Sequence, residues 1–315
     1  MAEQKKILLS GVKPTGRPHI GNYFGAMKQF VDLQDSYHTY VMVADYHALT
    51  SVQNKEDMKS LTHDLILDYL AIGLDPEKVI LFRQSDIGVH TELAWIFDCI
   101  TTMPYLMRAH AFKDGEAKNK EINVGVFNYP MLMAADILLY DAEVVPVGRD
   151  QKQHIEYARD TAQKFNNLFG ETFTLPQDLI IEDVETVPGT DGQKMSKSYN
   201  NTIPLFCSDE ELEKAVMSIV TDSSGELPKN VYAIHKLLRK EEELRRIYEE
   251  KKGKYKELKE MLLDDIKKIV VPMRARREEF EKDPERVKKI LEDGAARAKA
   301  VALAKMKLVR ETIGL

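Results

Sequence analysis

Short apolar runs alternate with helical patterns through the first half of the chain, and this alternation limits the fold more than any other feature. Four runs have the length and composition of buried strands, at residues 7–9, 39–43, 79–82 and 143–147. Between them, apolar residues recur at three- and four-residue spacing, for example after Asn54, which we expect to cap a helix. Such alternation predicts right-handed βαβ units. The predicted fold class is therefore α/β, with a parallel sheet.

The first apolar run is followed by a turn rich in Pro and Gly and then by a helical pattern. The turn and helix start occupy residues 13–25, which read KPTGRPHIGNYFG. A helix N-terminus presents unpaired N–H groups and a partial positive charge, and Gly lets a ligand approach the backbone closely. His19 at this entrance can donate hydrogen bonds to phosphate oxygens, and Asn22 adds a polar group. The segment predicts either a phosphate site or a structural turn in which His19 caps the helix.

A second segment with phosphate chemistry lies far downstream, at residues 194–198, which read KMSKS. Lys194 and Lys197, among Ser and Gly residues, form a flexible cationic clamp that suits a leaving polyphosphate. The negative charge that such lysines offset is largest in the transition state of phosphoryl or adenylyl transfer. Taken alone, the segment could also be a solvated basic loop.

Residues 129–140, which read YPMLMAADILLY, predict a buried helix with Pro130 in its first turn. Asp136 is the exception in this apolar segment, because an unpaired buried carboxylate is costly. Asp136 either pairs with a backbone donor or an Arg, or accepts a hydrogen bond from a ligand N–H or O–H. In the second case Met133 packs on an aromatic face of the ligand. The pattern alone leaves both interpretations open.

Polar residues also follow two of the predicted strands, where open α/β sheets bind ligands. His47 comes shortly after the second strand, and the fourth strand is followed by Gly148-Arg149-Asp150-Gln151 and a helix over residues 151–166. Asp150 is placed to cap that helix and could accept a hydrogen bond from a ribose hydroxyl. Gln151 could bind an amino group or a carboxylate. Residues 173–191 are predicted to be irregular, with turns at Pro residues.

From Ser208 onward the pattern is helical, starting with a capping box. Further helices are predicted near residues 230–238, 241–251, 255–273 and 285–313. The net charge of −6 divides into −13 over residues 1–230 and +7 over residues 231–315. An acidic body with a basic last part favours a polyanionic partner, although solvated helix faces would give the same charges.

Composition excludes several other classes of protein. No apolar run approaches the roughly 20 residues of a membrane span, and the N-terminus lacks the pattern of a signal peptide. The two cysteines, Cys99 and Cys207, cannot build a disulfide framework or a four-cysteine metal site. We therefore expect a reduced, cytoplasmic compartment.

Together, HIGN at residues 19–22 and KMSKS resemble the two signatures of class I aminoacyl-tRNA synthetases. The segments YPMLMAADILLY and GRDQKQHIEYARD between them are most similar to bacterial-type tryptophanyl-tRNA synthetases, and the resemblance covers nearly the whole chain. It implies a Rossmann-type nucleotide-binding domain over residues 1–205 and an all-helical anticodon-binding domain over residues 206–284. The last helix, about residues 285–315, could pack back on the first domain. The resemblance also implies a homodimer.

The implied activity is that of a tryptophan–tRNA ligase. It would use Mg²⁺-ATP to form tryptophanyl-AMP, release pyrophosphate, and transfer tryptophan to the 2′-hydroxyl of the terminal adenosine of tRNA(Trp); no protein-bound metal cluster is implied. The resemblance assigns catalytic roles to His19, Lys194, Lys197 and Ser198. It assigns ATP contacts to Lys13, Pro14, Thr15, Gly21, Asn22, Gly148, Arg149, Asp150, Val187, Lys194, Met195, Ser196, Lys197 and Ser198. It assigns tryptophan contacts to Asp136, Tyr129, Met133, Gln151 and His47, with Asp136 accepting the indole N–H.

The chain departs from some relatives at three positions: Lys13 replaces Gln, His19 replaces Thr, and Tyr199 replaces Asp. These variants affect the detailed phosphate contacts. Lysines of a polar segment that follows Phe112 are candidates for the mobile-loop lysine of the family; they are Lys113, Lys118 and Lys120.

Three other functions share part of this pattern. A tyrosyl-tRNA synthetase has both signatures, but its pocket pairs the Asp with a second phenol-binding group from the first strand, where Leu9 offers only packing. A regulatory paralogue that binds tryptophan or tRNA would not need both phosphate signatures. A small-molecule adenylyltransferase would need neither the helical domain nor the basic last part.

Overall fold

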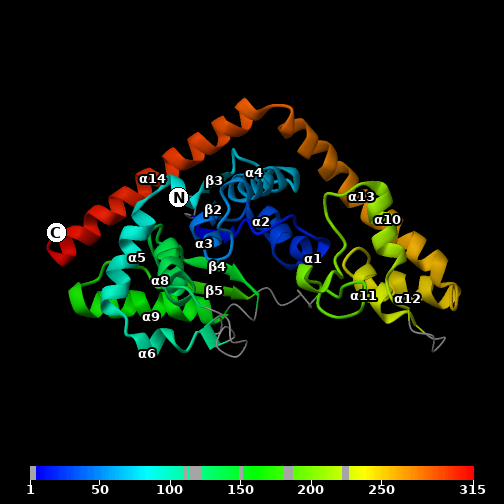
Figure 1. Ribbon diagram of the computed structural model, residues 1–315, viewed down its shortest axis with the longest axis horizontal. Coiled ribbons are helices and arrows are strands. Elements are labelled where there is room, and N and C mark those ends of the chain that lie inside the picture. Colours follow the sequence, from blue (N-terminus) through cyan, green and yellow to red (C-terminus); the bar gives the residue numbers. More distant parts are fainter. Residues whose placement is uncertain (1–4, 110–111, 114–121, 149–151, 181–186, 222–226) are drawn as a thin grey trace.

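The computed structural model describes residues 5–109, 112–113, 122–148, 152–180, 187–221 and 227–315 (Figure 1). Within these residues, five parallel strands form one sheet in the order β3-β2-β1-β4-β5. The strands are β1 (Ile7–Val12), β2 (His38–Val43), β3 (Val79–Arg83), β4 (Val144–Val147) and β5 (Gln177–Ile180). The predicted α/β class and the parallel sheet are confirmed, and all four predicted strands are present.

The strand order places a topological switch point between β1 and β4. From β1 the chain moves outward through β2 to the edge strand β3, and it then returns to the other side of β1 as β4. Because the connections leave β1 and β4 in opposite directions, a crevice opens beyond the carboxyl ends of these two strands. The turn at residues 13–19 follows β1 and Gly148 follows β4, so both flank this crevice.

Helices cover both faces of the sheet. Alternate residues of β2 and β3 point to opposite faces: Val41 and Leu81 belong to one buried cluster, and Tyr40 and Phe82 to the other. The first cluster lies under α4 (Lys55–Ala71) and a continuous helical segment formed by α1 (Ile20–Asn22), η1 (Tyr23–Met27) and α2 (Lys28–Leu33). The second lies under α5 (Val89–Ile100), α8 (Val124–Leu138) and α9 (Lys152–Phe169).

Two of the predicted capping residues, Asn54 and Ser208, act as expected. The Asn54 side chain accepts hydrogen bonds from the N–H groups of Glu56 (2.9 Å) and Asp57 (3.0 Å) at the start of α4. Ser208 forms the predicted capping box with Glu211 at the start of α10 (Asp209–Met217). These side chains satisfy N–H groups that the first helical turn leaves without partners.

Two local predictions are wrong. Pro130 does not lie in the first turn of its helix, because α8 already begins at Val124, where Asn123 accepts a hydrogen bond from the Val126 N–H (2.9 Å). The cap lies in a polar segment, outside the apolar run that suggested the helix start. Residues 173–191 also contain a strand, β5, which pairs only with β4. Edge strands need not be apolar on both faces, so the sequence QDLI does not show the pattern of the central strands.

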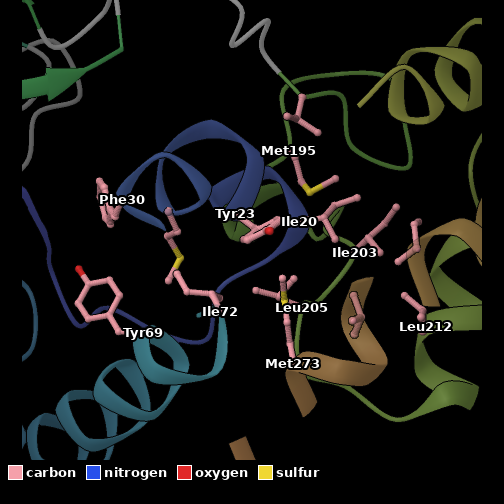
Figure 2. Packing of buried hydrophobic residues seen from close by; sticks show 14 of the residues in the cluster. Ile20, Tyr23, Phe30, Tyr69, Ile72, Met195, Ile203, Leu205, Leu212 and Met273 are labelled. Carbon is pink, nitrogen blue, oxygen red and sulfur yellow. The ribbon is translucent and has the colours of Figure 1, made fainter. Parts of the chain in front are cut away.

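The described part of the chain after Ser208 is helical. It contains α10, α11 (Lys229–His235), α12 (Glu241–Glu250), α13 (Tyr255–Glu281) and α14 (Pro284–Ile313). The shorter helices gather around α13, which rises to meet α14 beyond the sheet (Figure 1). One apolar cluster continues from Ile20 and Tyr23 through Leu205 to Leu212 and Met273 (Figure 2). The helical segment formed by α1, η1 and α2 and the C-terminal helices therefore share a core.

The last helix, α14, packs along the edge strand β3. The contact is so close that a Cβ added to Gly294 would lie 1.9 Å from the Leu81 carbonyl oxygen, so only glycine fits there. Farther along α14, Arg310 forms a bidentate ion pair with Glu92 of α5 (2.7 and 2.6 Å). No described helix combines the length and apolar composition that a membrane-spanning segment needs.

Candidate active site

The two predicted phosphate-binding segments meet at the switch point. The chain around residues 18–20 runs beside residues 203–205, with the Ile20 N–H donating to the Ile203 carbonyl (2.9 Å) and the Leu205 N–H to the Pro18 carbonyl (3.1 Å). This pairing brings the KMSKS segment against the first turn. A Cβ added to Gly16, where φ is +126°, would lie 3.0 Å from Lys197 Nζ. The Lys197 ammonium thus lies against the backbone of the turn at residues 13–19, which follows β1.

The turn itself combines exposed and buried residues. Lys13 and Thr15 are exposed, Pro14 is buried, and the Thr15 N–H donates to the Lys13 carbonyl (2.9 Å). Gly21 packs closely, because an added Cβ would lie 3.2 Å from Met195 Sδ. Surrounding protein removes water from the Lys13 ammonium and lowers its pKa, although the residue reaches solvent.

The KMSKS segment consists of a buried anchor between exposed polar residues. Met195 is buried in the apolar cluster beside Ile20 and Tyr23 (Figure 2), and its N–H donates to the Val187 carbonyl (3.0 Å). The side chains on either side of the anchor are those predicted to act on phosphate, and Lys194, Lys197 and Ser198 are exposed. The Ser198 N–H donates to Ser196 Oγ (3.3 Å) in the short 3₁₀ helix η4 (Lys197–Tyr199).

His19 is a neutral helix cap at this site. Its Nδ1 accepts a hydrogen bond from the Asn22 N–H (3.2 Å), and its own N–H donates to Asn22 Oδ1 (3.1 Å). Burial and the Lys197 charge lower the His19 pKa to about 4. Because Nδ1 accepts, the proton of the neutral ring is on Nε2. The residue therefore both caps the helix, as one interpretation predicted, and carries an N–H donor suited to a phosphate oxygen.

This protonation state makes a testable contribution to stability. An unfolded histidine binds a proton below about pH 6.5, whereas folded His19 does so only near pH 4, so its burial destabilises the fold as the pH falls. Between pH 7 and pH 5 the loss is about 2 kcal/mol. His19→Asn keeps a capping oxygen and removes the titrating group. Urea unfolding at pH 7, 6 and 5 gives the free energy of unfolding of the wild type and of His19→Asn, and only the wild type should show this loss. If the free energy of unfolding falls equally with pH in both proteins, the prediction is wrong.

Asp136 lies at the centre of a buried hydrogen-bond network. Its Oδ1 accepts from Gln84 Nε2 (2.7 Å) and His90 Nδ1 (2.7 Å), and its Oδ2 accepts from His47 Nε2 (2.8 Å). His90 Nε2 in turn accepts from the Tyr140 hydroxyl (2.8 Å). The helix α8 supplies Asp136 and Tyr140 is just beyond it, while His90 belongs to α5 and His47 to α3 (Asp45–Ala48). Asp136 therefore has partners within the protein. They are neither a backbone donor nor an Arg, the two partners that the first interpretation of this residue predicted.

The network keeps Asp136 ionised and leaves one acceptor position. Burial alone would raise the pKa of this carboxyl, but hydrogen bonds from His47 and His90 outweigh burial and lower it. An ionised carboxylate offers about four lone-pair positions, two on each oxygen. Two donors bind Oδ1 and one binds Oδ2, so Oδ2 can accept one further hydrogen bond.

A cavity of about 220 Å³ lies next to His47 and Tyr129, lined also by Trp95, Asp98 and Asn128. The His47 and Tyr129 rings meet edge to face with centroids 6.5 Å apart. Burial raises the pKa of Tyr129 to about 12, so its hydroxyl stays protonated. Burial also raises the pKa of Asp98 to about 6, although a hydrogen bond from Asn128 (3.2 Å) lowers this pKa and so opposes the shift.

Comparisons with known proteins identify the family. Residues 1–282 match the model of the tRNA synthetases class I (W and Y), the enzymes for tryptophan and tyrosine. The chain belongs to this family. It is 50% identical to the tryptophan–tRNA ligase of Fusobacterium nucleatum over 98% of this chain and 97% of that protein, and 46% identical to that of Rhodopirellula baltica over 98% and 99%. Within the class I synthetases it is thus a bacterial tryptophanyl-type chain.

Solved structures agree with this assignment. The tryptophanyl-tRNA synthetase of Campylobacter jejuni, determined in complex with ADP and tryptophan, matches with a TM-score of 0.90 and 42% identity over 98% of this chain and 100% of that one. A tyrosyl-tRNA synthetase from Archaeoglobus fulgidus matches with a TM-score of 0.72 but only 19% identity, which shows the shared fold alone.

The two class I signatures, HIGN and KMSKS, thus lie next to each other in the structure. Part of the predicted site lies outside the described residues. Arg149, Asp150 and Gln151 are in this group, as are Lys118 and Lys120, while Lys113 is described and exposed. Gly148 follows β4 directly, and Met133, one turn before Asp136, is partly buried. Among the described residues, no three His, Cys, Asp or Glu side chains gather as they would around a metal ion.

Three members of the Asp136 network, Gln84, His90 and Tyr140, were not expected from sequence. Gln84 follows β3 directly, and the rule that polar residues after parallel strands line ligand sites could have found it, as it found His47. His90 and Tyr140 carry no such signal, because each lies within or beside a helix that covers the sheet. Their role depends on how α5 packs against α8.

Proposed function

We propose that this chain activates L-tryptophan with ATP and transfers it to tRNA(Trp). The tryptophan carboxylate attacks the α-phosphorus of ATP in line, pyrophosphate leaves, and tryptophanyl-AMP forms. The 2′-hydroxyl of the terminal adenosine then attacks the tryptophanyl carbonyl, and AMP leaves. Neither step needs a covalent intermediate on the protein, so positioning and electrostatic stabilisation supply the catalysis.

The observation that carries this proposal is the contact between the two class I signatures. Lys197 Nζ comes within 3.0 Å of a Cβ position on Gly16, at the crevice where a parallel sheet of this order binds nucleotides. A phosphate chain lying over Gly16 would meet the ammonium directly. The relatives at 42–50% identity, all tryptophan–tRNA ligases, support tryptophan as the amino acid.

The ATP site we propose is built from the first turn, the residues after β4 and the KMSKS segment. His19 Nε2–H donates to a phosphate oxygen, while Lys194, Lys197 and Ser198 contact the leaving pyrophosphate. Around them, the turn and the helix start contribute Lys13, Pro14, Thr15, Gly21 and Asn22. Gly148, Arg149 and Asp150 hold the ribose, Val187 contributes backbone contacts to adenine, and Met195 and Ser196 complete the KMSKS contacts. Mg²⁺ enters with ATP as part of the substrate.

The tryptophan site we propose centres on Asp136. Its free acceptor position on Oδ2 suits the indole N–H, with His47 and Met133 beside the ring. Tyr129 and Gln151 hold the α-amino group. Phenylalanine has no N–H, so it would leave a buried acceptor of Asp136 unpaired, which is a strong basis for discrimination.

The proposed partners are tRNA and a second copy of the chain. Helices over residues 206–284 form the anticodon-binding part, and the net charge of +7 over residues 231–315, which span most of this part and α14, favours a polyanionic partner. Exposed apolar side chains on α5, α8 and the intervening helix α6 (Met103–Leu106) support a homodimer; they are Trp95 (69% exposed), Met103 and Val124. The proposed compartment is the cytoplasm.

Amino-acid-dependent ATP–pyrophosphate exchange tests the proposal. We expect exchange with tryptophan and less than about a thousandth of that rate with phenylalanine, which has no donor for Asp136. Comparable exchange with tyrosine would instead identify a tyrosyl-tRNA synthetase. Tryptophan binding by calorimetry without exchange would favour a regulatory paralogue and exclude the ligase.

A further inference from the structure

Asn201 lies three residues beyond the KMSKS segment and uses every hydrogen-bonding group of its side-chain amide on the loop around that segment. It is 2% exposed. Its Nδ2 donates to Asp191 Oδ1 (2.7 Å) and to the Lys194 carbonyl (3.1 Å), and its Oδ1 accepts from the Ser196 N–H (2.8 Å). One side chain thus holds the backbone at two positions of the motif.

Asn201 packs closely against the residues that begin the loop. A Cβ added to Gly189 would lie 2.4 Å from Asn201 Cγ, so glycine is required where the loop begins. The Asn201 carbonyl accepts from the Thr190 N–H (2.9 Å). Asp191, which receives one amide hydrogen, also accepts from the Gln193 N–H (3.0 Å) just before the motif.

These contacts fix where the two lysines start. The Lys194 backbone is held through its carbonyl, and Ser196, held through its N–H, is the cap of η4, whose first residue is Lys197. Asn200 then takes a left-handed conformation (φ 52°), which turns the chain so that the side chain of the next residue points back into the loop. The two lysine side chains remain exposed, so their positions depend on a backbone that Asn201 holds.

We propose that Asn201 is a positioning residue for the lysine clamp. This inference rests on the proposed ATP chemistry, in which both ammonium groups offset the charge of the leaving pyrophosphate. Asn201 touches neither ammonium group, and it acts by setting the spacing of the backbone that carries them. Displacing a charge by about 1 Å from its position in the transition state can lower a rate about 100-fold.

The residue type follows from the contacts. The site requires two donors and one acceptor in one plane on a short side chain, which only asparagine supplies. Aspartate has the same shape, but it would place a carboxylate oxygen where Nδ2 now faces the Asp191 carboxylate and the Lys194 carbonyl. Alanine would remove all three hydrogen bonds.

The test compares Asn201→Ala and Asn201→Asp with the wild type and with Asn200→Gly, a matched control. The control changes the exposed neighbouring residue to one that accepts a positive φ at least as readily. For each protein, tryptophan-dependent ATP–pyrophosphate exchange gives kcat and the KM for ATP, and calorimetry gives the dissociation constant for tryptophan. Tryptophan binding also reports whether the protein is folded.

We expect both Asn201 variants to lower kcat about 100-fold and to raise the KM for ATP less than 10-fold, with tryptophan affinity unchanged. The control should match the wild type. A kcat within threefold of the wild type in either variant that binds tryptophan normally would overturn the inference. A parallel loss of kcat and tryptophan affinity in both would show a structural role only and would also overturn it. If the wild type itself gives no exchange, the proposed function falls, and this inference falls with it.

Discussion

Replacing Asp136 with asparagine is expected to lower kcat/KM for tryptophan about 1,000-fold in ATP–pyrophosphate exchange, which corresponds to about 4 kcal/mol of transition-state stabilisation. The carboxylate accepts hydrogen bonds from Gln84, His90 and His47 on its two oxygens. An amide has the same shape but only one acceptor oxygen. In either orientation its NH₂ group faces an N–H donor, and a buried donor left unpaired costs about 1–3 kcal/mol.

The same variant should lose specificity. In the wild type, phenylalanine leaves the Oδ2 acceptor unpaired, and this penalty contributes to its rejection. Asp136→Asn applies a comparable penalty to tryptophan, so the preference for tryptophan over phenylalanine should fall at least 100-fold. Competition experiments with the two amino acids measure this ratio directly.

Asp160→Asn is the matched control for this prediction. Asp160 also accepts a side-chain hydrogen bond, from the Tyr105 hydroxyl (2.6 Å), but it is exposed on α9 and outside the Asp136 network. We expect its kcat/KM to stay within threefold of the wild type. A similar result for Asp136→Asn would show that the indole N–H is recognised elsewhere.

The fold could be predicted from sequence wherever one element carries its own signal. Strands β2 and β3 are apolar on both faces because helices cover both sides of the sheet there, so residues 39–43 and 79–82 are recognisable without knowledge of their neighbours. The edge strand β5 is not, because half of its residues are polar. The start of α8 was misplaced for a related reason: its cap, Asn123, follows a polar segment that has no period.

The site could be predicted only in part, for the same physical reason. HIGN, KMSKS and Asp136 are visible because each contrasts with its own surroundings, such as a single carboxylate in an apolar helix. His90 and Asn201 are ordinary polar residues in their segments, and their importance comes from what tertiary packing brings to them. His90 is fully buried between Asp136 and Tyr140, residues about 50 positions away in the sequence.

Replacing Lys197 with methionine is expected to lower kcat for exchange about 1,000-fold while the KM for ATP rises less than 10-fold. Methionine keeps the apolar stem and removes the ammonium that lies over Gly16. Removing one preorganised group that stabilises developing charge lowers kcat about 100- to 1,000-fold. The effect falls on kcat because the ammonium acts mainly on charge that builds up as pyrophosphate leaves.

The pH dependence separates this role from simple attraction of ATP. Reduced hydration lowers the pKa of Lys197, although the Asp68 carboxylate opposes the shift. The lysine is active when protonated, so kcat should decline on the alkaline side at a lower pH than an ordinary lysine would give. Lys197→Met should lack that decline. Lys28→Met removes a lysine that pairs with Asp32 on α2, away from the clamp, and should keep both the rate and the pH profile. If both lysine variants raise the KM for ATP equally and leave kcat unchanged, Lys197 contributes only general charge, and the transition-state role is excluded.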